Sequence, residues 1–149
     1  MKIKNMIVYM SFLLISSIIS ITPLLANEDT KGVVNERMDK FKISIKMMQT
    51  IHISIQNEDY GTIEKSATTL YIWSKEMIKY FPEGSDGAPS EASADIWLDP
   101  EGFKKAVNNF ESASLKLINN SKEKDFDNTV DSFRSLAGTC KGCHQKFRN

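Results

Sequence analysis

Four stretches of the sequence repeat apolar residues every three or four positions, and this helical period constrains the fold more than any other feature. They run from about 31 to 56, 59 to 81, 100 to 120 and 126 to 147, and strand-like alternation is almost absent. Short links after the first and third stretches make neighbouring helices antiparallel. Because each helix has one apolar stripe to bury, we expect an all-α fold, an antiparallel four-helix bundle of about 120 residues.

Each stretch supplies its own expected core stripe and boundary signals. Asp59 can cap the second helix, Asp99-Pro100 is an N-cap followed by proline at the first helical position, and 82–99 reads as a loop because of its Gly and Pro content. The stripes are Val34, Met38, Phe41, Ile45, Met48 and His52; Ile63, Ala67, Leu70, Trp73 or Ser74, Met77 and Phe81; Phe103, Val107, Phe110, Ala113 or Ser114 and Leu117; and Phe126, Val130, Phe133, Ala137, Cys140, His144 and Phe147.

The first 26 residues have the order of a secretory signal peptide. Lys2 and Lys4 precede an uncharged and mostly apolar run over 7–21, and the segment ends on the small residue Ala26. An uncleaved anchor is the alternative, although the run is short for a membrane span of roughly 20 residues. We therefore expect cleavage after Ala26, a helical domain over 27–149 in the periplasm, and no membrane contact after cleavage.

Composition excludes several classes of protein. Lys plus Arg equals Asp plus Glu at 19 each, so no basic excess points to nucleic acid. Only two cysteines are present, which excludes a scaffold stapled by several disulfides.

Cys140-Lys141-Gly142-Cys143-His144 carries the chemistry of the chain. In an exported protein a C-x-x-C-H run indicates covalent attachment of haem c, with one thiol for each of two vinyl groups and His144 as the axial iron ligand. A thioredoxin-type redox pair would follow a strand at a helix N-terminus, whereas this pair ends a helix. Zinc would need two further ligands, and His52 is the only other histidine. Thiol redox chemistry and metal binding remain the less favoured alternatives.

The sequence resembles the cytochrome c′ family, helical-bundle c-type cytochromes whose haem site lies near the C-terminus. The resemblance covers nearly all of 31–149 and rests on Arg37, on Phe81-Pro82-Glu83-Gly84-Ser85, on Asp95-Ile96-Trp97 with Phe103, and on Cys140 to Arg148. Low-spin relatives place a methionine four residues after the helix-one arginine as the sixth iron ligand. Phe41 occupies that position here and cannot bind iron.

The resemblance therefore implies a five-coordinate, high-spin haem with Phe41 over its open face. Such an apolar pocket offers no hydrogen-bond donor, which nitric oxide and carbon monoxide do not need. We expect one-electron transfer with an unidentified redox partner protein and binding of these two gases. A six-coordinate, low-spin electron shuttle is the alternative, and it would need Met38 or another residue as the sixth ligand. An enzyme of the peroxidase kind is not expected, because it would need a distal His or Arg to move protons.

The resemblance also suggests roles for residues around the haem. It places Arg37 near a propionate and Arg148 beside the axial imidazole, and it makes Trp97 and Phe103 walls of the haem pocket. Each has a plainer reading: Arg37 as a solvated cation, Arg148 as a cation completing the last helix, and the two aromatics as core residues.

Members of this family commonly pair through their first two helices, so a homodimer is expected as a further partner. Ile43 and Ile51 fall off the first stripe and are compatible with such an interface, or with a wide apolar face on a monomer.

Overall fold

The computed structural model describes residues 26–149, and the expected signal peptide lies outside the described residues except for Ala26. Four long helices form the bundle: α2 (Ala26–Gln56), α3 (Tyr60–Glu76), α5 (Pro100–Lys122) and α6 (Phe126–Phe147). The 3-10 helix η1 (Met77–Tyr80) tightens the end of α3, and the short α4 (Asp95–Leu98) precedes α5. The predicted all-α four-helix bundle is therefore confirmed. The loop predicted over 82–99 contains α4, because four helical residues are too few to give a periodic signal.

Two tight connections make the long helices antiparallel. Each contains a residue in the left-handed region, Glu58 (φ 52°) or Lys124 (φ 55°), followed directly by an aspartate that caps the next helix. Asp59 accepts a hydrogen bond from the Thr62 amide, as predicted.

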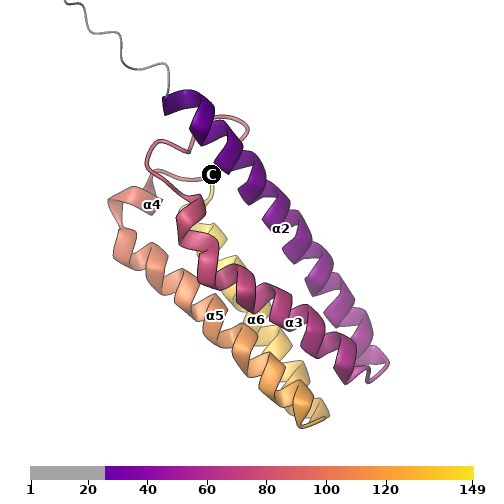
Figure 1. Cartoon of the computed structure of the whole chain (residues 1–149). Coiled ribbons are helices and arrows are strands. Elements are labelled where there is room, and N and C mark those ends of the chain that lie inside the picture. The colour runs from indigo at the N-terminus through magenta and orange to yellow at the C-terminus, as the bar shows by residue number, and fades with distance from the viewer. Residues whose placement is uncertain (1–25) are drawn as a thin grey trace, which may run out of the picture.

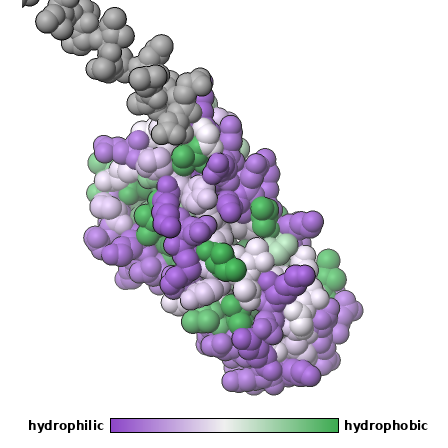
Figure 2. Space-filling view, in the orientation of Figure 1, coloured by the Kyte–Doolittle hydropathy of each residue, from purple (hydrophilic) through white to green (hydrophobic). Residues whose placement is uncertain are grey.

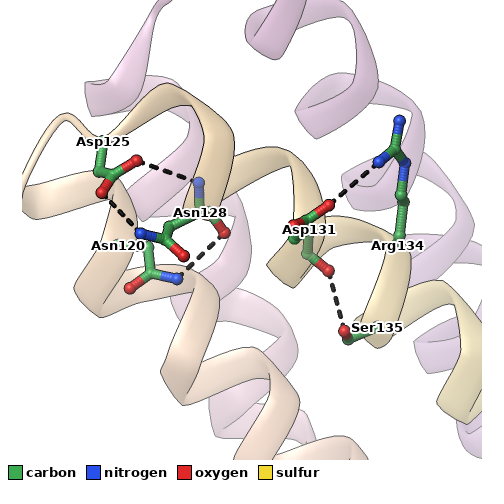
Figure 3. A network of polar contacts seen from close by, with 6 residues as sticks. All are labelled: Asn120, Asp125, Asn128, Asp131, Arg134 and Ser135. Carbon is green, nitrogen blue, oxygen red and sulfur yellow. Dashed lines mark hydrogen bonds and ion pairs between the residues drawn. The ribbon is translucent and has the colours of Figure 1, made fainter.

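Figure 3 shows the second connection, where the Asp125 carboxylate accepts from the amide of Asn128 at 3.0 Å and from its side chain at 2.7 Å. Asn120 near the end of α5 donates to the carbonyl of Asn128 at 3.0 Å, which ties the two helices together at the turn. The exposed Asp131–Arg134 pair, one turn further along α6, lies on the surface of the helix.

The two ends of the bundle are formed by different elements. In Figure 1 the start of α2, the end of α3, α4 and the C-terminus lie together at one end, and the tight connections lie at the other. α3 packs extensively on α5, and α5 on α6, whereas α2 packs along α3 and meets α6 over a much shorter stretch. The contact between α2 and α6 is consequently the shortest of those between neighbouring long helices.

The predicted core stripes of α3 and α5 are confirmed, and those of α2 and α6 are partly wrong. In α2, Ile51 falls off the predicted stripe but is fully buried, so its expected place in a dimer interface is wrong, whereas Ile45 and His52 of the stripe are exposed. In α6, the line of buried residues is Thr129, Ser132, Leu136 and Phe147, while Phe126, Ala137 and His144 are exposed. The reason is local: Asn120 of α5 donates to the Ser132 hydroxyl at 2.6 Å, so small polar residues of α6 face the neighbouring helix.

No helix among the described residues is both long and apolar enough to cross a membrane.

Candidate functional site

A cavity of about 580 Å³ lies between α2 and α6, with walls also from α4, α5 and the segment before α4. This volume is within the range of small-molecule and cofactor sites, roughly 300–1,000 Å³. Most of its lining is apolar, from residues such as Met38, Met48, Ile96, Val107 and Phe110. Both cysteines and His144 line the same cavity, so the residues of the C-x-x-C-H run are brought to one apolar site.

Cys140 and Cys143 are partly buried and form no disulfide. Burial raises the pKa of the Cys140 thiol, and burial together with the charge of Cys140 raises the pKa of Cys143 to about 11. At neutral pH both side chains are therefore thiols rather than thiolates, unlike the low-pKa cysteines of redox catalysts. Among the side chains that the structure describes, residues 30–149, no group of three or more His, Cys, Asp or Glu is placed to hold a metal ion.

His144 lies at the rim of the cavity and keeps part of its surface exposed to solvent. Burial lowers its pKa, the positive charge of Arg148 lowers it further, and Glu91 opposes this shift. The imidazole is consequently neutral at pH 7, the form that has a ring nitrogen free to bind a metal.

Phe41 of α2 faces this imidazole across the helices. The two ring centroids are 6.2 Å apart at an interplanar angle of 66°. Two other rings hold Phe41 edge-on, Trp73 at 5.7 Å and Phe81 at 6.4 Å. These contacts fix the orientation of the Phe41 ring. The side chain that faces His144 therefore has neither a hydrogen-bond donor nor a lone pair.

Arg37, one turn before Phe41, is 3% exposed and lines the cavity. Its Nη1 donates to the Tyr80 carbonyl at 2.8 Å and to the Ser85 hydroxyl at 2.9 Å. Its Nη2 donates to the Ser85 carbonyl and the Ser90 hydroxyl, each at 2.7 Å. The guanidinium also lies over the Phe81 ring at 4.2 Å. Arg37 is therefore a buried clamp on the segment after η1, not a solvated cation.

The three other predicted site residues, Phe103, Trp97 and Arg148, differ in their position relative to the cavity. Phe103 is buried, lines the cavity and packs edge-on against Phe81 at 4.9 Å. Trp97 does not line the cavity: its indole donates to the Phe81 carbonyl at 3.1 Å, so it supports that wall from behind. Arg148 is exposed, follows the end of α6 and lines the cavity together with His144.

Sequence reasoning missed Glu91. It lines the cavity and pairs with Arg148, whose Nε donates to its carboxylate at 2.7 Å. Nothing in the sequence indicates this contact, because the partners are 57 positions apart.

Comparisons with known proteins agree on one family. The sequence profile of the family described as Cytochrome C' matches residues 32–148. Cytochrome c′ from Rhodospirillum rubrum is 41% identical over 69 residues, which cover 46% of this chain and 47% of that protein. Cytochrome c′ from Rubrivivax gelatinosus is 38% identical over 76 residues, covering 50% and 59%. These matches span about half the length of the curated relatives.

Solved structures resemble the whole bundle. The crystal structure of cytochrome c′ from Rubrivivax gelatinosus has a TM-score of 0.70 at 26% identity, covering 78% of this chain and 94% of that one. Cytochrome c prime from Shewanella frigidimarina has a TM-score of 0.74 at 23% identity, covering 80% and 96%, which shows likeness of fold alone.

Proposed function

The chain belongs to the cytochrome c′ family of haem c-type cytochromes, and on this premise we propose that Cys140 and Cys143 hold one haem c, with His144 as the axial iron ligand. The residues present fit this group: the cavity is apolar, both thiols are free, and a neutral imidazole lies one residue from the second cysteine. Each thiol would add its sulfur and hydrogen across one vinyl group, a reaction that needs no oxidant. When bound, haem supplies an iron that exchanges one electron and accepts a ligand.

The placement of Phe41 opposite His144 carries the proposal of five-coordinate, high-spin iron. Phe41 has no atom that can bind iron, and its contacts with Trp73 and Phe81 keep its ring in this position. The open side is then an apolar pocket suited to carbon monoxide and nitric oxide. A nitric oxide complex is known for a mutant cytochrome c prime from Alcaligenes xylosoxidans, a protein of similar fold, which supports gas binding as a family trait.

Two separate substitutions, one at Phe41 and one at Met38, test this coordination. Met38 lines the same cavity and is the sixth ligand in the alternative, low-spin hypothesis. We expect ferric Phe41→Met to become six-coordinate and low-spin by electron paramagnetic resonance. The matched variant Met38→Leu should keep the wild-type high-spin spectrum and its carbon monoxide binding. A low-spin wild type that turns high-spin in Met38→Leu would instead establish the alternative.

The proposed role is gas binding and one-electron transfer without an organic substrate. A peroxidase would need a distal group free to move protons. Arg37 commits both terminal nitrogens to the segment after η1. His52 lies eleven residues beyond Phe41, roughly 16 Å along the helix axis, and its exposed ring stacks on Phe133. We therefore propose an exported electron carrier, cleaved after Ala26, that exchanges electrons with a periplasmic partner protein.

A homodimer through α2 and α3 is the remaining part of the proposal. Ile43 and Ile72 are 47% and 57% exposed and border a groove of about 160 Å³ between the two helices. On the face that Figure 2 shows, apolar residues gather in several patches separated by polar ones. A cytochrome c′ of similar fold is described as having a ligand-controlled dimer dissociation. Sedimentation should show a wild-type dimer and a monomeric Ile43→Lys variant, and a wild-type monomer at tens of micromolar contradicts the dimer.

A further inference from the structure

The chain end is fastened to the segment before α4 beside His144. The Ser93 amide donates to the Phe147 carbonyl at 3.0 Å, and the Asn149 amide donates to the Glu91 carbonyl at 2.9 Å. These bonds flank an isolated antiparallel bridge between Ala92 and Arg148. The backbone therefore sets Glu91 and Arg148 side by side.

The two charged side chains meet at the cavity. Both Nε and Nη2 of Arg148 donate to one Glu91 oxygen, and both residues line the cavity that also holds His144. The side chains are 51% and 60% exposed, so water screens the pair and its own contribution to folding is small. The pair therefore contributes little to stability. Because it lies beside His144, its main effect is on the electrostatic potential at that residue.

We propose that Glu91 is a positioning residue for the iron site: it fixes the Arg148 guanidinium beside His144 and offsets its positive charge, which lowers the reduction potential. The inference rests on the proposed function, in which His144 binds haem iron. Reduction adds one negative charge to the site, so a nearby cation favours the reduced form and a nearby carboxylate opposes it. The placement of Glu91, Arg148 and His144 on the lining of one cavity supports this electrostatic coupling.

The test is the reduction potential of the haem-loaded protein with Glu91→Gln. We expect a rise equivalent to a two- to fivefold larger equilibrium constant for reduction, about the size of an exposed charge interaction. Glu83→Gln is the matched control, because Glu83 is an exposed glutamate of the same loop that does not line the cavity. Glu91→Asp keeps the charge and should stay close to the wild type. The difference between wild type and Glu91→Gln should shrink as salt rises, because screening shortens the range of the interaction.

Amide hydrogen exchange separates the charge effect from anchoring. In Glu91→Gln the amides of Ser93 and Asn149 should remain protected, because both donate to backbone carbonyls. The proposal is wrong if Glu91→Gln raises the potential no more than Glu83→Gln. It is also wrong if Glu91→Asp shifts the potential as much as Glu91→Gln, since the carboxylate charge would then not matter.

Different results contradict the proposed function and the role of Glu91. A wild-type protein without covalently bound haem contradicts the proposed function before any variant is compared. A haem-loaded protein whose potential does not respond to Glu91 contradicts this inference alone.

Discussion

Replacing Arg37 by methionine should destabilise the protein by about 3 kcal/mol. The substitution keeps a long apolar stem on α2 but removes all four hydrogen bonds to the segment that carries Phe81. Two of them end on Ser85, which is 1% exposed, so its oxygens lose their donor in a place that water does not readily reach.

The magnitude follows from opposing terms. Hydrogen bonds from a charged donor contribute about 1.5–3 kcal/mol each, and a buried acceptor left without a donor costs about 1–3 kcal/mol. Against this, the wild-type protein removes a guanidinium from water, at a cost of several kcal/mol that the variant avoids. The same burial lowers the pKa of Arg37. The hydrogen bonds and the desolvation cost both disappear with the guanidinium and largely offset each other, so about 3 kcal/mol of net loss remains from the two Ser85 oxygens left without a donor, at about 1–3 kcal/mol each.

Urea denaturation measures the effect. With a slope of about 2 kcal/mol per molar, the midpoint should fall by about 1.5 M. Lys42→Met is the matched control, because Lys42 is on the same helix with its side chain 70% exposed and should show no measurable change. An Arg37→Met midpoint within about 0.3 M of the control would refute the clamp.

Two further predictions concern α6. Leu136→Ala should lower the free energy of unfolding in urea by about 2–5 kcal/mol because Leu136 is fully buried. Phe126→Ala, at a position that is 46% exposed, should lower it clearly less. Equal losses would contradict the register of α6. Hydrogen bonds from Asn128 lower the pKa of Asp125 below 3.8, so its stabilisation is present above that value and is lost as pH falls through the folded-state pKa. Asp125→Asn keeps the cap without the titration and should therefore reduce the loss of unfolding free energy as pH falls below about 4. An unchanged profile would contradict this.

The accuracy of the sequence-based prediction differs between helices for a physical reason. α3 and α5 pack against helices on both sides, so their apolar stripes coincide with the buried residues, as Leu70 and Leu117 show. α2 and α6 border the cavity and meet over a short stretch. Apolar residues of α2 are consequently divided between the cavity, as Ile45 is, and the helix contact, as Ile51 is. A single stripe cannot describe that division.

The candidate site was predictable where its signal is local. The C-x-x-C-H run lies within five residues, and the resemblance to cytochrome c′ indicated Phe41, whose ring the structure places opposite His144. The contacts of Arg37 and the Glu91–Arg148 pair join residues 43 to 57 positions apart. Such contacts follow from tertiary packing, so periodicity and spacing do not reveal them.

The intact mass of protein purified from a cell that exports it and makes c-type cytochromes tests the central claim most directly. We expect the mass of residues 27–149 plus one haem, with both cysteines blocked to thiol reagents. A mass equal to the polypeptide alone, with two free thiols, would contradict it.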